Sequence, residues 1–178
     1  MEVKGASVLY TLAGLMITFA GFSSLLLALR PAAGARLSLL DRYLAKTVMT
    51  FIFVLVAGAL LPALLALYEL PDQWVWRGAG LVFGCPMLLL QATYPRRRRN
   101  VVGSGPPPVV FAVLVVVGVV ATMTMLACVL AGCPCRAAVY ITALTVDFFT
   151  VVFGYLMALE IIMQQPLEVR ERTEGEGA

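Results

Sequence analysis

Hydrophobic residues in this chain fall into five long runs that polar segments separate. The runs cover residues 8–29, 48–68, 78–94, 108–132 and 137–163. A helix needs about 20 apolar residues to cross about 30 Å of hydrocarbon. The first four runs contain no charged residue, and the fifth contains Asp147 and Glu160. The pattern therefore predicts an all-α integral membrane protein, a bundle of about five transmembrane helices.

Two of the five runs have a second interpretation. The third run is the shortest and contains Gly-Cys-Pro at residues 84–86, so it could be a re-entrant loop instead of a kinked crossing. The first run could be a signal peptide, with Ala-Gly-Ala at residues 33–35 as a cleavage site. Its length and the acidic Glu2 at its start favour an uncleaved span. We therefore expect five crossings.

The residues outside the runs form short loops and a tail. Residues 1–166 are expected to form a single transmembrane domain. Residues 167–178 are expected to form a charged tail, either mobile or a helical extension of the last span. Residues 38–46 mix apolar and charged positions at helical spacing, which predicts a short interfacial helix after the first span.

The positions of Lys and Arg predict the orientation in the membrane. With the N-terminus outside and the C-terminus inside, ten of the thirteen basic residues lie on the inner side. An excess of Lys and Arg is typical of inner loops. The pattern therefore predicts an N-out, C-in protein, and we expect it in a bacterial inner membrane.

One basic run stands out at the end of the third span, and it consists of Arg96, Arg97, Arg98 and Arg99. Beside an inner helix end, such a run fixes the topology and contacts anionic lipid headgroups. It lacks the interleaved aromatic residues and the folded scaffold that nucleic-acid recognition needs, so no nucleic-acid partner is expected.

Composition narrows the classes of function. Hydrophobic residues make up 61% of the chain, charged residues 13%, and histidine is missing. A soluble domain carries about 25% charged residues, so a soluble enzyme is excluded. Without histidine there is no His-ligated haem or metal and no His-based catalytic pair. The sequence also has no nucleotide-binding loop or metal-ligand motif, so we predict no cofactor, no metal and no catalytic residue.

Asp147 is the charged residue nearest the middle of a predicted span. It lies ten residues into the fifth run, about 15 Å along a helix. A carboxylate at that depth costs about 2.5–3.5 kcal/mol on insertion scales, so it is expected to face a bundle interior, a cavity or a partner. No Lys or Arg lies within a run. Asp147 is therefore either a proton or cation site, or a protonated acid bonded to a Thr hydroxyl or a carbonyl across a helix interface.

Other residues complete the candidate sites. Thr145, Thr150 and Glu160 are the further candidates for an ion or proton pathway, although an interfacial salt bridge is the simpler role for Glu160. Small residues at helical spacing predict close helix packing. These are Thr11, Gly14, Thr18 and Gly21 in the first run, and Gly154 and Ala158 in the fifth. The first of these sets could also line a pore.

Cysteines suggest a third kind of chemistry. Cys133 and Cys135 flank a proline at the predicted outer end of the fourth span, with Cys128 and Cys85 inside spans. This set resembles that of membrane disulfide-forming quinone reductases, which are small helical bundles with thiols at the outer face. The resemblance implies redox chemistry at Cys133 and Cys135. Those enzymes use CxxC, however, and the single residue between the thiols here strains a bridge. The alternative is packing cysteines and a loop-capping pair.

Three functions are therefore compatible with the sequence. The favoured one is a homo-oligomeric, channel-like protein or an ion or proton pathway that uses Asp147. The second is an accessory or scaffold subunit of a larger membrane complex, in which Asp147 meets a partner's cation. The third is a membrane thiol-disulfide oxidoreductase. An acid without a deep cation and two sets of small residues favour an oligomer over a lone monomer.

Overall fold

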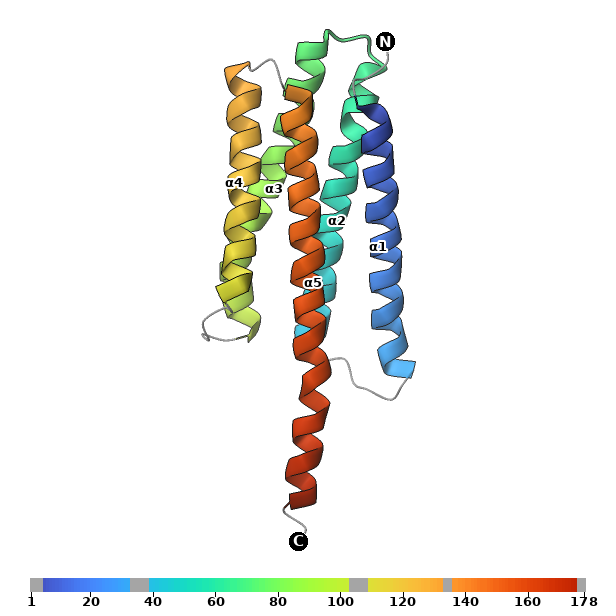
Figure 1. Cartoon of the computed structure of the whole chain (residues 1–178), viewed down its shortest axis with the longest axis vertical. Helices are drawn as coiled ribbons and strands as arrows, with labels where there is room; N and C mark the ends of the chain where they lie inside the picture. The colour runs from blue at the N-terminus through green and yellow to red at the C-terminus, as the bar shows by residue number, and fades with distance from the viewer. Residues whose placement is uncertain (1–4, 33–38, 103–108, 133–135, 176–178) are drawn as a thin grey trace.

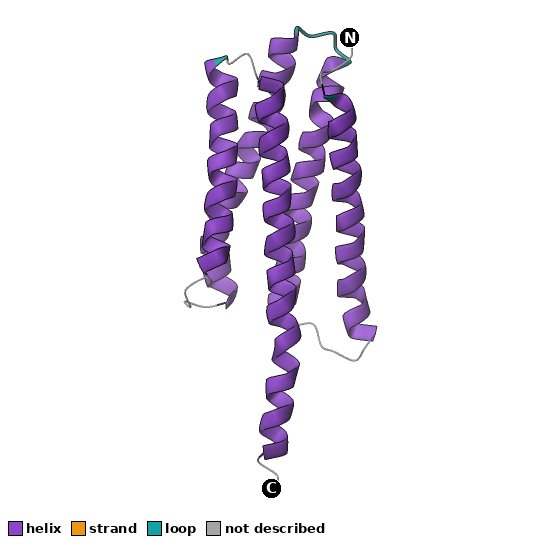
Figure 2. Ribbon diagram, viewed as in Figure 1, coloured by secondary structure: helices purple, strands orange, loops and turns teal. Residues whose placement is uncertain are grey.

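The computed structural model of the chain describes residues 5–32, 39–102, 109–132 and 136–175. All regular structure within these residues is α-helical (Figure 2). The elements are α1 (Ala6–Ala32), α2 (Leu39–Ala66), α3 (Asp72–Val102), α4 (Val109–Ala131) and α5 (Arg136–Gly175). Each contains a segment long and apolar enough to cross a membrane. The chain is therefore an all-helical, multi-pass membrane protein, as the hydrophobic pattern predicts.

The five helices run up and down in sequence order (Figure 1). Each helix packs against the next one along the chain, and α5 also packs against α2. This contact closes α2, α3, α4 and α5 into a four-helix bundle. Helix α1 lies outside the bundle, where it packs mainly against α2 and more lightly against α5. The interior of the bundle is thus enclosed by four of the five helices.

The two ends of the bundle carry different residues. At one end α2 stops, and α3 begins with Trp74 and Trp76; we call this the tryptophan end. At the other end α2 begins, and α3 reaches Arg96 and Arg97; we call this the arginine end. Helix α5 extends past the other helices at the arginine end, as far as Gly175 (Figure 1). The tail through that residue is therefore a helical extension of the last span.

The extents of α3 and α2 decide two points that the hydrophobic pattern left open. Helix α3 is continuous from Asp72 to Val102, so the third hydrophobic run is long enough to cross and is not a re-entrant loop. The segment predicted as a separate interfacial helix is continuous with the second span from Leu39 onward, and that prediction is not confirmed. The physical reason is that no Gly or Pro separates Lys46 from the apolar run, so nothing in the sequence ends the helix there.

Aromatic rings fill the bundle interior toward the tryptophan end. Tyr140 packs edge-to-face against Trp76 and Phe83, with ring centroids 5.6 and 5.8 Å away. All three rings are buried, and we call them the aromatic plug. The Tyr140 hydroxyl donates a hydrogen bond to the Gly58 carbonyl at 2.7 Å, which satisfies its polar atom inside the bundle. A side chain at Gly58 would collide with the Phe83 ring, because a Cβ there would lie 2.5 Å from a ring carbon.

Candidate functional site

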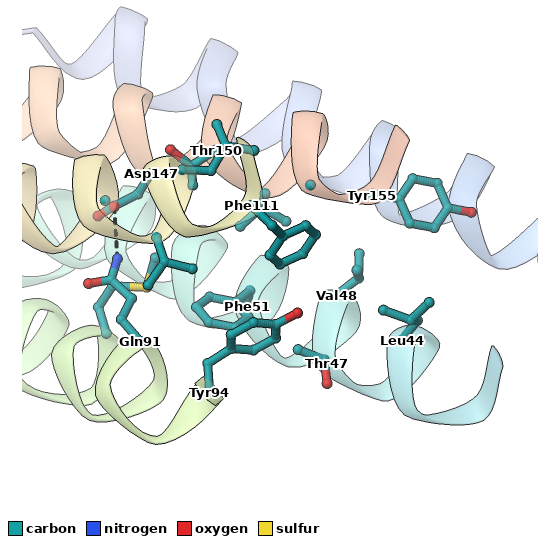
Figure 3. A pocket seen from close by; sticks show the side chains of 16 residues that line it. Leu44, Thr47, Val48, Phe51, Gln91, Tyr94, Phe111, Asp147, Thr150 and Tyr155 are labelled. Atoms are coloured by element: carbon teal, nitrogen blue, oxygen red, sulfur yellow. Dashed lines mark hydrogen bonds between the residues drawn. The ribbon is translucent and has the colours of Figure 1, made fainter. Parts of the chain in front are cut away.

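Asp147 lies on the face of α5 that points into the four-helix bundle, and none of its surface is exposed. Two buried polar side chains from neighbouring helices reach its carboxyl group. Gln91 of α3 donates from Nε2 to Oδ1 at 3.0 Å, and Thr122 of α4 lies with its Oγ1 2.9 Å from Oδ2 (Figure 3 shows the first of these bonds). Both partners are themselves buried. We call Gln91, Thr122 and Asp147 the buried polar cluster.

Gly118 of α4 makes room for this cluster. A Cβ at this position would lie 3.0 Å from Gln91 Nε2 and 3.1 Å from Asp147 Oδ1. Both distances are shorter than ordinary van der Waals contact, so any side chain here would displace the amide or the carboxyl group. Glycine therefore allows the α4 backbone to approach both polar groups closely.

The Thr122 hydroxyl has one proton and two acceptors within reach. Its Oγ1 lies 3.1 Å from the Gly118 carbonyl oxygen and 2.9 Å from Asp147 Oδ2. When Asp147 is ionised, the hydroxyl donates to the carboxylate. When Asp147 carries a proton on Oδ2, the acid donates to Thr122 Oγ1, and the hydroxyl donates to Gly118 instead. The same positions of the heavy atoms therefore serve both protonation states of Asp147.

A cavity of about 80 Å³ adjoins Asp147 on the side of the arginine end (Figure 3). Helices α2 to α5 all contribute to its wall, and α1 does not. A cavity needs only about 10–15 Å³ and a few polar partners to hold a water molecule. The Gln91 amide oxygen is buried and has no hydrogen-bond partner within the described part of the chain. The site therefore has both the space and the unfilled hydrogen-bonding capacity for water.

The cavity wall is mostly apolar. Among the described residues, its polar side chains are those of Thr47, Gln91, Tyr94, Asp147, Thr150 and Tyr155. Asp147 is the one charged residue among the described residues that line it. No basic side chain of the wall is thus available to neutralise an ionised Asp147.

Aromatic side chains line the cavity toward the arginine end, and its wall also includes Leu44 near the start of α2. Tyr94 and Phe111 stack with their centroids 5.6 Å apart, and Phe51 lies beside them in Figure 3. A larger groove, of about 500 Å³, lies between α2 and α3 at the arginine end. It shares Thr47, Phe51 and Tyr94 with the cavity wall. The cavity is therefore next to this groove on one side and has the aromatic plug on the other.

Comparison with protein-family models, with curated proteins and with solved structures gives no match for this chain. The function is therefore inferred from the geometry of the chain itself.

The other residues predicted for a pathway lie in different surroundings. Thr150 and Gly154 line the cavity with Asp147. Thr145 is half-buried, donates to the Ile141 carbonyl of its own helix at 2.7 Å and does not line the cavity. Glu160 is exposed on α5. The structure thus brings Thr150, but not Thr145 or Glu160, to the wall of the Asp147 cavity.

The small-residue set of α1 faces away from the rest of the chain. Thr11, Gly14, Thr18 and Gly21 are all exposed. A Cβ added at Gly14 or Gly21 would meet nothing within 4 Å. Within the described part of the chain, the predicted packing at these positions is therefore not packing against another helix.

The remaining predicted residues do not line the cavity beside Asp147 or lie outside the described residues. Arg96 and Arg97 are exposed and Arg98 is half-buried at the end of α3. The side chains of Arg99 and Ala158 lie outside the described ones. Cys133 and Cys135 lie outside the described residues, so redox chemistry at this pair stays a prediction.

Gln91 and Thr122 were not among the residues predicted for a site. Each is a polar residue inside an apolar run, which is the signal that could have drawn attention to them. The sequence does not tell which polar residues of different spans meet. That depends on how each helix is rotated about its axis, and only the packed bundle determines it.

Proposed function

We propose that the protein forms a proton pathway through its four-helix bundle, in which Asp147 binds and releases the proton. The observation that carries this proposal is the position of the Thr122 hydroxyl between Asp147 Oδ2 and the Gly118 carbonyl. A carboxyl group that can gain or lose a proton without moving its neighbours suits transient proton binding. The adjoining cavity provides room for water to carry the proton toward the arginine end.

The chemistry of the cluster favours a proton over a metal cation. Metal ions such as Ca²⁺ take six to eight oxygen ligands. No group of three or more Cys, Asp or Glu side chains that could hold a metal occurs among the described residues. Gln91 also directs an N–H donor, not an oxygen, at the carboxyl group. This N–H group occupies the carboxylate oxygen that a metal cation would need as a ligand. The arrangement therefore favours proton exchange over cation binding at Asp147.

The one-sided cavity supports a gated pathway over an open channel. The cavity approaches the arginine end, where Phe51 and Tyr94 separate it from the groove. On the other side, the buried rings of Trp76, Phe83 and Tyr140 fill the interior. We therefore place the loading of Asp147 at the arginine end, with passage to the other face requiring movement of the aromatic plug.

We place the arginine end at the inner face of a bacterial inner membrane. Arg42, Lys46 and the arginines at the end of α3 lie there, against Arg77 and Arg136 at the tryptophan end, and inner segments are typically the more basic. Cysteine labelling in intact cells tests the orientation. In a background in which the four native cysteines are replaced by serine, Gln73→Cys should react with a membrane-impermeant thiol reagent, and Arg96→Cys should react only after permeabilisation. The opposite labelling pattern would show that the arginine end lies at the outer face.

A second candidate function is a subunit of a larger membrane assembly, built through α1. The exposed small-residue set of α1 supports it, because such sets allow close approach of helices from separate chains. Asp147 does not add to this support, since its partners come from its own chain. The mass of the detergent-extracted particle tests it. We expect a mass above that of one 19.1 kDa chain, and a reduction to one chain in the Gly14→Leu, Gly21→Leu double variant.

Proton flux into liposomes tests the proposed pathway. Purified protein is reconstituted with a pH-sensitive dye inside the vesicles and a clamped membrane potential. We expect flux with the wild-type protein and none with Asp147→Asn. Thr145→Val is the matched control, because Thr145 lies on the same helix, bonds only within it and does not line the cavity. Absence of flux in the wild type, or equal flux in Asp147→Asn, would contradict the proposal.

A further inference from the structure

The groove between α2 and α3 has features that the proton pathway does not need. Its polar side chains include the cations of Lys46 and Arg97 and the hydroxyls of Tyr43 and Thr47. Both cations are exposed. No acidic side chain lines the groove among the described residues. The groove is therefore a cationic site without a counter-charge in its own wall.

We propose that this groove binds an anionic phospholipid, with its phosphate held by Lys46 and Arg97. Guanidinium and ammonium groups are the usual protein ligands of phosphate. Basic pockets between transmembrane helices are also known recognition sites for acidic headgroups. This inference does not rest on proton transport, because none of its steps involves Asp147.

The depth of the groove supports a lipid as its occupant. The hydrophobic run of α2 begins at Val48, and that of α3 ends at Tyr94. Lys46 thus lies two residues and Arg97 three residues outside these runs, about 3 and 4.5 Å along their helices. Long basic side chains at such positions extend toward the interface, where lipid phosphates lie.

The groove is basic at its mouth and apolar further into the membrane, as a phospholipid has its phosphate at the interface and its acyl chains in the hydrocarbon. The cations lie toward the arginine end, and Leu90 and Phe51 lie further into the membrane on α3 and α2. Thr50 is also deep, but its hydroxyl donates to the Lys46 carbonyl at 2.7 Å. Its hydrogen-bonding capacity is thus engaged with its own helix. A phosphate at the mouth and an acyl chain along Leu90 and Phe51 fit this order, whereas a free phosphate leaves the apolar part uncovered.

The neighbouring Arg96 offers a matched control. It is exposed, belongs to the same basic run and carries the same charge as Arg97, but it does not line the groove. A diffuse attraction between the basic run and anionic lipids would weaken equally on loss of either arginine. A site in the groove depends on Arg97 and Lys46 and not on Arg96.

Native mass spectrometry of the full-length protein in neutral detergent, titrated with lipid, tests the proposal. We expect phosphatidylglycerol to bind more tightly than phosphatidylcholine with the same acyl chains. Lys46→Gln and Arg97→Gln should each weaken phosphatidylglycerol binding about fivefold, as expected for one basic group near a headgroup. Arg96→Gln should leave it unchanged. The melting temperature of each variant confirms that it is folded.

Three results would overturn the proposal. Equal binding of the two lipids would show that the groove does not recognise the anionic charge. An equal loss in Arg96→Gln would show diffuse attraction to the basic run. Displacement of phosphatidylglycerol by millimolar inorganic phosphate, used as a soluble competitor, would show a site for a free anion and not for a lipid.

Discussion

The two halves of the four-helix interior are built from the same helices but are packed in opposite ways. Toward the tryptophan end, the rings of Trp76, Phe83 and Tyr140 occupy the space between the helices. Toward the arginine end, a cavity of about 80 Å³ remains beside Asp147. This cavity is partly open to its surroundings. Its volume gives room for water beside the buried carboxyl group, which the half with the aromatic rings does not.

Glycines show the same difference on a smaller scale. Gly58 and Gly118 each lie where a side chain from another helix comes too close for a Cβ. At Gly58 the approaching group is the ring of Phe83, and the result is a closed interior. At Gly118 the approaching groups are an amide and a carboxyl group, and the result is a positioned polar cluster. A glycine that allows close approach thus lets aromatic rings fill the tryptophan half and lets the polar cluster form in the arginine half.

The largest effect on stability is expected for Gly58→Val, which tests whether the tryptophan half is closed by packing. The new side chain would overlap the Phe83 ring and should lower the free energy of unfolding by about 3 kcal/mol, toward the upper end for overpacking. Unfolding in mixed detergent micelles measures it. Ala57→Val, at an exposed position of the same helix, is the control and should change stability far less. Equal effects at both positions would show that the tryptophan half tolerates added volume.

A smaller effect is expected when the buried polar cluster loses its acid. Asp147→Leu removes the 3.0 Å bond from Gln91 Nε2 and leaves this buried group only the longer 3.5 Å contact with Thr122 Oγ1, so it should cost about 2 kcal/mol. Asp147→Asn keeps a group that can accept from Gln91 and should remain close to wild type in stability. The same unfolding measurement compares the two variants. If Leu is as stable as Asn, the bond from Gln91 does not contribute as the geometry implies.

Thr122→Val is expected to cost less stability than Asp147→Leu but to reduce proton flux. It removes the hydroxyl that serves both protonation states, and with it the 2.9 Å bond to Asp147 and the long 3.5 Å contact from Gln91, which together are worth about 1 kcal/mol. Thr124→Val is the control on the same helix, because Thr124 is exposed and bonds only to the Val120 carbonyl. The liposome assay should show reduced flux only for Thr122→Val. Equal flux in the two variants would remove Thr122 from the pathway.

The smallest effect is expected for Tyr140→Phe. It retains the ring of the aromatic plug and removes only the bond to the Gly58 carbonyl, so stability should fall by about 0.6 kcal/mol, the average for a hydrogen bond between membrane helices. Tyr10→Phe, on the exposed face of α1, is the matched control. A loss as large as that of Gly58→Val would show that this bond, and not ring packing, closes the tryptophan half.

The sequence predicts the crossings well because hydrophobic length is a property of each segment alone. Five helices of spanning length and an interior position for Asp147 both follow from the cost of placing polar groups in hydrocarbon. The partners of Asp147 do not follow in this way. In the sequence, Gln91 and Thr122 do not differ from other polar residues of a span. Only the rotation of α3 and α4 about their axes places both side chains against Asp147.

For the small-residue sets too, the sequence does not predict which neighbour a helix face contacts. Gly154 lies inside the bundle and Gly14 outside it, although both belong to patterns that predict packing. The spacing identifies a face but not what that face meets. The continuous start of α2 has a similar cause, since charged residues such as Arg42 are compatible with either an interfacial helix or the first turns of a span.

Infrared difference spectroscopy of the reconstituted protein shows whether Asp147 changes its protonation state inside the bundle, as the proton pathway requires. Spectra recorded at low and high pH, with isotope-labelled aspartate, report the carboxylic acid carbonyl band. We predict a band of a buried protonated aspartate that disappears at high pH and is missing at every pH in Asp147→Asn. A band of Asp147 that does not change with pH, or wild-type difference spectra identical to those of Asp147→Asn, would show that Asp147 does not exchange a proton inside the bundle.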